Sequence, residues 1–357
     1  MFTAFLDNGS GEQLLYAPIN GAAEAVFSPK LNSEINKADS FSFIIPPTNP
    51  MYAILTPFLS IVTVYDGTDR IFRGRVRDTK KTMNNCVTVS CESEIAWLTD
   101  IDIMPYNETA TGATGQNHPN LADWVGYFMG IYNGMAHTSR RFSVIAPIDT
   151  RVVTRSNDNA SNVYTELASL AEDYGLQMLC EPVSGGGTQI TFDFLPTSMS
   201  AQTIEFGKNI LSLEDYLDTD TFATRVTGIN DDVPGSPVTY TNEDAERELN
   251  TVIRRIVNID NVSSLDELKS FTIEEKNKRS TLAESITVNA IDLHLVDDTV
   301  TPFGIGQLYT FSSPPHGINT VLRCSKINRD LANPKNNKYV FGRTRKTLTE
   351  QIYKIGG

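Results

Sequence analysis

Pairs of carboxylates are the first residues of this sequence whose types and spacing could do chemistry. Side chains two residues apart share one face of a β-strand, so two such carboxylates could act as a general acid and base or bind Ca²⁺. The close pairs are Asp100 and Asp102, Asp218 and Asp220, and Asp297 and Asp298. Neither a glycine-punctuated calcium loop nor an aromatic platform for sugars surrounds them, so solvated strand ends and turns are the favoured interpretation.

The cysteines could supply a nucleophile if one of them met a histidine in space. They form no C-x-x-C motif, so we expect free, mostly buried thiols from a reducing cytoplasm. Cys91 falls inside a predicted strand and Cys180 ends another, which favours inert core thiols over a Cys–His pair. The four are Cys86, Cys91, Cys180 and Cys324.

The histidines are scattered, and none is spaced from a second histidine, a carboxylate or a thiol as metal ligands usually are. His294, on an apolar-rich strand, is expected to be hydrogen-bonded or solvated, whereas His118 and His316 are expected in surface turns. The four are His118, His137, His294 and His316. The sequence therefore predicts no metal site.

Motifs for nucleotide binding or hydrolysis do not occur either. The sequence lacks a Walker A motif, G-x-S-x-G, H-E-x-x-H and G-x-G-x-x-G. Arg73-Gly74-Arg75 could bind an anion, but alternating arginines on an exposed strand face are the favoured interpretation. We therefore predict no catalytic residue and no cofactor.

The length and composition of the chain limit what kind of protein it can be. A chain of 357 residues is expected to form two to four domains, and an apolar content of 40% is enough to build their cores. No run of about 18 apolar residues occurs, and no cationic leader precedes Asp7. We therefore expect neither membrane insertion nor export by a signal peptide.

The charge is unevenly distributed along the chain. Residues 201–300 hold nine basic and twenty acidic residues, whereas residues 301–357 hold nine basic and two acidic ones. A formal net charge of −13 suits a phosphate backbone poorly, because gripping one needs clustered cations. The basic end is therefore expected to face the acidic 201–300 region of its own or a neighbouring copy.

The first hundred residues predict antiparallel β-structure. Short β-branched or aromatic runs alternate with turn signals, which is typical of a small barrel or sandwich. The runs are Phe41–Ile45, Ile61–Val64, Ile71–Val76 and Cys86–Cys91.

Helical periodicity begins after Pro119. Apolar residues from Leu121 to Tyr132 recur at helical spacing, with Asn120 as the N-cap and Gly134 after the end. A second helix opens near Ser161 and stops at Gly175. Two predicted strands follow it, 176–180 and 189–194, joined by a glycine-rich turn, so an α+β unit is expected over about 101–205.

The remainder mixes strands with one charged helix. Strands are predicted at 222–229 and 238–240 around the loop 231–237, and Ser264 with Glu267 suits the capping box of the helix. In the next strand the apolar alternation slips between Ala290 and Ile291, which a β-bulge would explain. Short β-segments follow from 306 to 347.

Several local strings resemble the prophage endopeptidase tail family, also described as the N-terminal part of tail-associated lysins. The similarity follows the order of the chain over nearly its whole length. The strings are SFSFIIPPTNPMY at 40–52, IFRGRV at 71–76, CESEIAWLTD at 91–100 with Pro105-Tyr106, INRDLANP at 327–334 and KTLT at 346–349.

This resemblance implies an α+β, mostly β, multi-domain fold similar to baseplate hubs, with two small antiparallel β-barrel domains and α+β domains between them. The implied limits are an N-terminal barrel at 1–100, an α+β domain at 101–210, a second barrel at 211–345 with a helical insertion at about 241–282, and a tail at 346–357.

The resemblance also implies a role in the virion, at the tail tip of a (pro)phage made in the host cytoplasm. A homotrimeric ring would close the tail tube, conduct DNA without specific binding, and meet a distal tail or tail-tube protein, a tape-measure protein, and a separate lysin or receptor-binding protein. Its subunit contacts are predicted at the basic stretch Arg323, Lys326, Arg329, Arg343, Arg345 and Lys346.

Two alternatives stay open beside the hub. The family label and the aspartate pairs suggest a wall-degrading endopeptidase or glycosidase, but no peptidase motif is present, so we expect no enzyme activity. A module that binds wall carbohydrate would need exposed aromatic residues, whereas the two tryptophans, Trp97 and Trp124, are predicted to be core.

Overall fold

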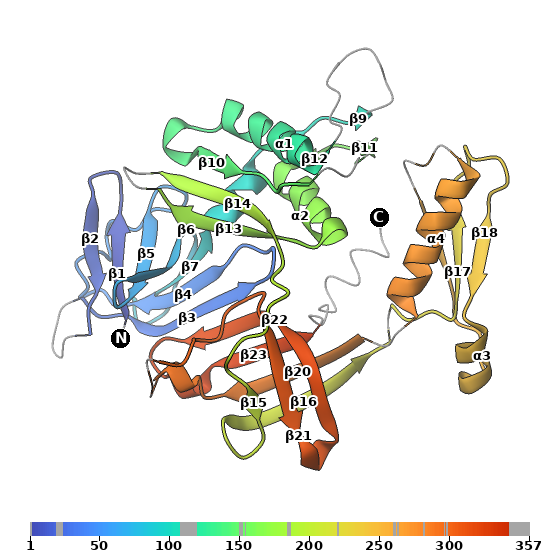
Figure 1. Ribbon diagram of the computed structural model, residues 1–357. Helices are drawn as coiled ribbons and strands as arrows, with labels where there is room; N and C mark the ends of the chain where they lie inside the picture. Colours follow the sequence, from blue (N-terminus) through green and yellow to red (C-terminus); the bar gives the residue numbers. More distant parts are fainter. Residues whose placement is uncertain are drawn as a thin grey trace.

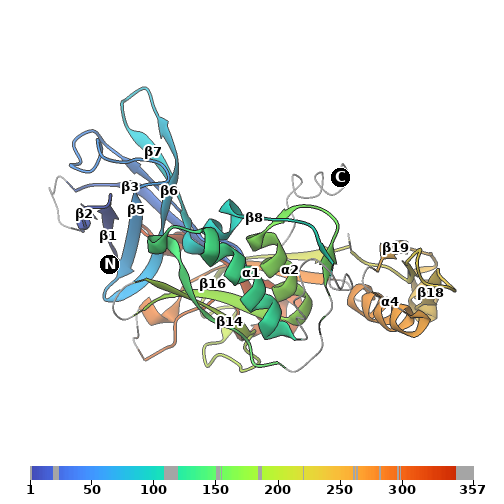
Figure 2. The same cartoon turned by 90° about the horizontal axis from the view of Figure 1, so that it is seen from above.

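The computed structural model (Figures 1 and 2) describes residues 2–18, 24–107, 120–149, 153, 155–183, 187–219, 221–259, 262, 264–280, 283–295, 297 and 299–342. Strands predominate, so the expected mostly β fold is confirmed. Within these residues, no helix is long and apolar enough to cross a membrane.

The N-terminal region is a curled antiparallel sheet around its own hydrophobic core (Figure 1). The predicted strands at 41–45, 61–64, 71–76 and 86–91 are confirmed as β4, β5, β6 and β7. Three further strands precede them. The bounds are β1 (Phe2–Asp7), β2 (Glu12–Tyr16), β3 (Phe27–Glu34), β4 (Ser40–Ile45), β5 (Ile61–Asp66), β6 (Asp69–Lys81) and β7 (Val87–Ser93).

Two helices and a small sheet form the α+β unit above this region. Helix α1 (Leu121–Met135) begins where predicted, because the Asn120 side chain accepts a hydrogen bond from the backbone N–H of Asp123. Its end was predicted too early, since Gly134 lies inside the helix. Helix α2 (Val163–Tyr174) opens near Ser161 as predicted, with Asn162 as its N-cap, and ends at Gly175, which has the left-handed conformation.

Strand β14 lies between β10 and β13 and pairs antiparallel with β13, so the predicted pair at 176–180 and 189–194 is confirmed. The glycine-rich turn joining them lies largely outside the described residues. The unit's other elements are η1 (Glu94–Asp100), β8 (Asp102–Ile103), β9 (Tyr106–Asn107), η2 (Thr138–Arg140), β10 (Phe142–Ile145), β11 (Ser156–Asn157), β12 (Ser161–Asn162), β13 (Leu176–Pro182) and β14 (Thr188–Phe194).

The C-terminal strands enclose a further core and continue the N-terminal sheet. Strand β22 pairs antiparallel with β3, so one sheet runs through both regions in the order β16-β20-β23-β22-β3-β4-β7-β6-β5-β1-β2. The elements are β15 (Ile204–Glu205), β16 (Ile210–Asp218), β20 (Ala283–Ala290), η3 (Leu293–Leu295), β21 (Leu308–Ser313), η4 (Pro314–His316), β22 (Ile318–Asp330), η5 (Pro334–Asn336) and β23 (Lys338–Gly342).

The β-bulge predicted after Ala290 is wrong in its position. Strand β20 ends at Ala290, and Leu293 and Leu295 belong to the 3-10 helix η3. The irregularity lies in the partner strand β16, where Ile210 and Ser212 face consecutive residues of β20 and leave Leu211 unpaired. The apolar alternation at positions 291, 293 and 295 therefore does not mark a strand, because the chain continues after Ala290 into a 3-10 turn.

A separate arm projects from the C-terminal region (Figures 1 and 2). It consists of β17 (Arg225–Ile229), β18 (Val238–Thr241), α3 (Glu243–Leu249), β19 (Arg254–Asn258) and α4 (Leu265–Arg279). Its small core includes Val233 and Val262 with Leu268 of α4. Ser264 caps the start of α4 as the predicted capping box requires, since its Oγ accepts a hydrogen bond from the backbone N–H of Glu267. The domain limits given above stay predictions.

Candidate functional site

The predicted carboxylate pairs do not assemble into a catalytic pair among the described residues. Both carboxylate oxygens of Asp100 bind the guanidinium of Arg75, one of them at 2.8 Å, whereas Asp102 lies in the short strand β8. Asp297 is exposed and accepts hydrogen bonds from Thr299. Asp220 and Asp298 lie outside the described residues, as does the side chain of Asp218.

The cysteines are free thiols, as predicted, and two of the four are buried. Burial raises the pKa of Cys91 and of Cys180, and the nearby carboxylates Glu94 and Asp39 raise the pKa of Cys180 further. Burial also raises the pKa of Cys324 to about 12. A nucleophilic cysteine needs the opposite, an electropositive surrounding that lowers its pKa, so these three thiols are suited to packing.

The histidines are placed in turns and short helices. His316 Nδ1 lies 2.6 Å from the Ser313 hydroxyl in η4, which agrees with the predicted surface turn. His294 is hydrogen-bonded as predicted, through Nδ1 to the Val300 carbonyl oxygen at 2.7 Å, but it lies in η3 and not in a strand. His118 lies outside the described residues. Where the chain is described, no three His, Cys, Asp or Glu side chains are grouped to hold a metal.

Arg73 and Arg75 do not lie on an exposed strand face, so that expectation is wrong. They point from β6 toward the α+β unit, and the side chain of Arg75 is only 3% exposed. Arg73 binds Glu94, a buried carboxylate that also accepts a hydrogen bond from Thr188 of β14. The two arginines therefore bind the α+β unit to the N-terminal sheet. The alternating pattern in the sequence of β6 could not show that this unit covers the arginine face of the strand.

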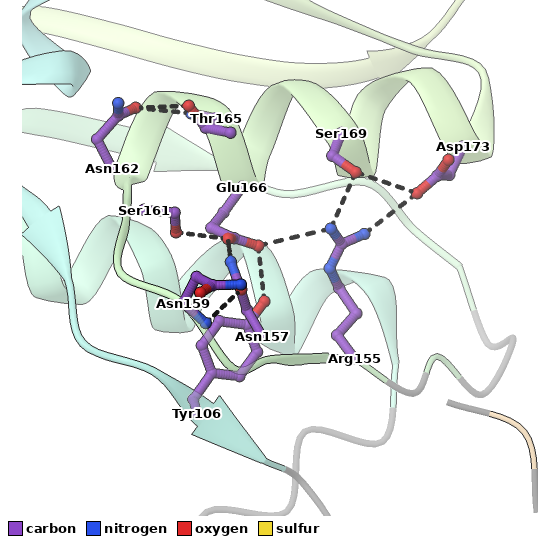
Figure 3. Close-up of polar contacts among 10 residues, drawn as sticks. All are labelled: Tyr106, Arg155, Asn157, Asn159, Ser161, Asn162, Thr165, Glu166, Ser169 and Asp173. Carbon is purple, nitrogen blue, oxygen red and sulfur yellow. Dashed lines mark hydrogen bonds and ion pairs between the residues drawn. The ribbon is translucent and has the colours of Figure 1, made fainter. Parts of the chain in front are cut away.

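A buried polar cluster centres on Glu166 (Figure 3), a residue of α2 that is 4% exposed. Its carboxylate accepts hydrogen bonds from Ser161 Oγ at 2.5 Å, Tyr106 Oη at 2.6 Å and Asn157 Nδ2 at 2.7 Å. Arg155 adds an ion pair at 3.5 Å. The cluster joins α2 to the two-stranded sheet of β9 and β11.

This environment fixes the charge of Glu166. Burial alone would raise the pKa of the carboxyl, but hydrogen bonds from Ser161, Tyr106 and Asn157, with the charge of Arg155, hold it below its usual range. A general acid needs a raised pKa instead. An ionised carboxylate surrounded by donors from several elements is suited to holding those elements together.

Sequence reasoning missed Glu166, although the sequence carries a signal for it. The apolar stripe of α2 includes Val163, Leu167 and Leu170, and Glu166 lies three residues after Val163 and four before Leu170. A carboxylate in the apolar stripe of a helix must find partners in the interior.

The tryptophans are core residues, as predicted. Trp97 is 1% exposed and Trp124 is 2% exposed, and both belong to the hydrophobic core of the α+β unit. Trp97 packs against Phe142, and Trp124 stacks on Phe128 of the same helix. Neither presents a face on which a sugar could stack.

Two of the predicted interface residues line a groove of about 600 Å³ over the β3–β22 junction, which we call the seam groove. Lys326 and Arg329 lie in it, whereas the guanidinium of Arg323 donates to the carbonyl oxygens of Pro196 and Gly306 in its own chain. The other three, Arg343, Arg345 and Lys346, lie outside the described residues. Their role in an interface stays a prediction.

A second groove, of about 1020 Å³, lies between the N-terminal sheet and β13, and Asp39 lines it. Burial raises the pKa of Asp39 to about 6, although a hydrogen bond with Ser33 and the charge of Arg329 oppose the shift. The folded protein therefore holds this proton more tightly than the unfolded chain does. Its contribution to the free energy of unfolding should fall as the pH rises from about 4 to about 6.

Replacing Asp39 by asparagine removes this buried charge, so the variant should be more stable than the wild type above pH 6, by about 1–2 kcal/mol. The advantage should disappear near pH 4. Urea unfolding at pH 4.5 and 7.5 measures it, with the exposed Asp158→Asn as the control. An equal effect of Asp39→Asn at both pH values would contradict the assignment.

Comparison with known proteins shows which proteins share this fold. A family model described as prophage endopeptidase tail matches residues 198–352. No curated protein matches the sequence. Solved structures match nearly the whole chain, and at the identities of the three described next the likeness shows a shared fold.

The first is the tail protein from Neisseria meningitidis MC58, with 13% identity, a TM-score of 0.66 and coverage of 96% of both chains. The 43 kDa tail protein of prophage MuSo2 from Shewanella oneidensis has 14% identity, a TM-score of 0.64 and coverage of 96% of this chain and 98% of that one. Prophage tail protein gp18 from Listeria monocytogenes EGD-e has 14% identity, a TM-score of 0.59 and coverage of 99% and 98%. The resemblance is thus confirmed: residues 198–352 match the prophage endopeptidase tail model, and nearly the whole chain has the fold of these tail proteins.

Proposed function

We propose that this protein is a structural component of a phage tail, a homotrimeric hub that closes the tail tube at the tail tip. The observation that carries the proposal is the fold, which nearly the whole chain shares with three tail proteins, two of them from prophages. In the virion the ring would conduct DNA and provide a platform for host-contacting or lytic components.

The charge of the chain supports a conduit that DNA crosses without specific binding. A net charge of −13 repels phosphates that come within the Debye length, about 8 Å at physiological salt. The proposed partners are two further copies of the chain, a distal tail or tail-tube protein, a tape-measure protein, and a separate lysin or receptor-binding protein. No cofactor is part of the proposal.

Light scattering on size-exclusion fractions tests the trimer. We expect a mass near three times 39.5 kDa over a wide range of concentrations. Because the proposed contacts join basic and acidic surfaces, 1 M NaCl should weaken the trimer at least about tenfold, as the Debye length shrinks to about 3 Å. If salt does not weaken the trimer, burial of apolar surface rather than charge holds the interface together. A monomer at every concentration, with no binding to a tail-tube protein, would contradict the hub.

The endopeptidase in the family's description needs its own test. Among the described residues the candidate carboxylates are bound by their own chain or exposed in turns, so we propose no catalytic role. A zymogram on purified cell wall should show no clearing by the wild type. Clearing that disappears in the Asp100→Asn or Cys180→Ser variant would overturn this part of the proposal.

A further inference from the structure

We propose that the seam groove receives the acidic helix α3 of a neighbouring copy, so that copies of this protein join head to tail. The inference rests on the proposed homotrimer and names the surfaces that would form its contacts. The charge and exposure of the groove and of α3, together with the position of the arm, support it.

The seam groove has an excess of positive charge. Five cations and two carboxylates line it. Glu34 is shared between Lys37 at 2.7 Å and Lys326 at 3.4 Å. Asp330 instead accepts hydrogen bonds from the backbone N–H groups of Ala332 and Asn333 in the loop that follows it.

Two lysines of the groove are left for an outside partner. Lys30 of β3 and Lys338 of β23 are exposed, and neither forms an ion pair within the described part of the chain. The register places Lys338 beside Asn328 and Asn32 across three strands, and Lys30 one step further along β3. Asn328 and Asn32 lie between the two cations, and Asp330, which stands opposite Lys30, has its carboxylate held by its own loop. The groove therefore keeps an excess of positive charge, which suits an anionic segment lying across it.

Helix α3 at the end of the arm has the complementary charge. It holds four carboxylates and one arginine. Glu246 is bound by Arg225 at 2.9 Å, and Asp244 pairs with Arg247 on the exposed surface. Glu243 and Glu248 are exposed and, in the described residues, form no ion pair.

Apolar side chains next to α3 add contact area. Leu249 ends α3 and is 48% exposed, and Val252 and Ile256, further along the chain, are 54% and 60% exposed. Grouped exposed aliphatic residues beside a charged helix are typical of a surface that another protein covers.

The two surfaces cannot meet within one chain. Figure 1 shows α3 at the lower right end of the arm, far from the junction of β3 and β22, and Figure 2 shows the arm projecting away from the rest of the chain. The complement of each surface must therefore come from another copy. Two different patches that join in this way form a heterologous interface, which closes into a ring when the rotation allows it.

Charge reversal on each surface tests the pairing. The groove variant Lys30→Glu/Lys338→Glu and the arm variant Glu243→Lys/Glu248→Lys should each weaken the trimer at least about tenfold, measured by light scattering over a dilution series. A chain that carries all four substitutions restores opposite charges and should recover the trimer. Lys80→Glu/Lys81→Glu on the exposed end of β6 is the matched control and should assemble like the wild type.

The outcomes separate this inference from the proposed function. If the wild type and both reversal variants form equally stable trimers, the hub stands and the pairing of α3 with the seam groove is wrong. Failure of the four-substitution chain to recover the trimer, with its circular dichroism unchanged, also overturns the pairing. A wild type that stays monomeric at every concentration and binds no tail-tube protein overturns the hub itself.

Discussion

Replacing Glu166 by leucine is expected to lower the free energy of unfolding of the α+β unit by about 3–5 kcal/mol. The carboxylate is buried and serves Tyr106, Asn157, Ser161 and Arg155 at once. Leucine fills much of the same volume but leaves these donors without an acceptor, and an unpaired buried polar group costs more than its hydrogen bond contributes. Urea unfolding followed by tryptophan fluorescence measures the loss, because Trp97 and Trp124 belong to this core.

Glu172→Leu is the matched control, since Glu172 is an exposed residue of the same helix and its replacement should change stability by less than about 0.5 kcal/mol. The variant Glu166→Gln keeps the shape of the side chain but removes its charge, so it measures what the charge alone contributes to stability. Because the folded protein lowers the pKa of Glu166, the charge stabilises the fold above the unfolded pKa of about 4.3, and this contribution is lost as the pH falls through the folded value. The difference between wild type and Glu166→Gln should therefore shrink in acid; a constant difference would contradict the ionised state.

The helices of the α+β unit could be predicted from sequence because local signals define them. Asn120 and Gly175 set helix ends by hydrogen bonds and backbone conformation within a few residues. Gly134 misled the prediction of the end of α1, because a glycine tolerated inside a helix looks the same in sequence as one that ends it.

The sequence could not predict the contacts between segments that lie far apart in the chain. The pairing of β22 with β3 joins residues nearly 300 positions apart, and neither strand carries a signal that names its partner. The misjudged position of Arg73 and Arg75 has the same origin, since an alternating polar pattern reads as exposed unless a second unit covers it. The seam groove likewise depends on the pairing, because its cations come from both ends of the chain.

The same long-range contacts bear on the proposed role. A hub must transmit force between subunits without its units separating, and here a continuous sheet links the N-terminal and C-terminal regions. The ion pairs of Arg73 with Glu94 and of Arg75 with Asp100 link the N-terminal sheet to the α+β unit as well. Such ion pairs contribute little net stability compared with apolar packing, but removing one partner leaves the other charge buried and unpaired, which is costly. They therefore fix the position of the α+β unit relative to the sheet.

Gly74→Ala is expected to disrupt this arrangement, with a loss of about 2–4 kcal/mol in the free energy of unfolding. Gly74 is buried in β6 between β5 and β7. A Cβ atom here would overlap the backbone carbonyl oxygen of Glu92 and lie 2.7 Å from the end of the Phe72 ring. A backbone oxygen cannot rotate away as a side chain can, so β6 and β7 must separate.

The damage should extend beyond the strand, because Arg73 and Arg75 flank Gly74 and bind the α+β unit through Glu94 and Asp100. Amide hydrogen exchange should therefore increase in η1 and β14 as well as in β6 and β7. Gly126→Ala is the matched control: Gly126 is exposed in α1 with no atom near the added Cβ, and alanine should stabilise the helix by about 0.5–1 kcal/mol. If Gly74→Ala changed exchange only in β6 and β7, the arginines would not couple the two units, and apolar packing alone would hold them together.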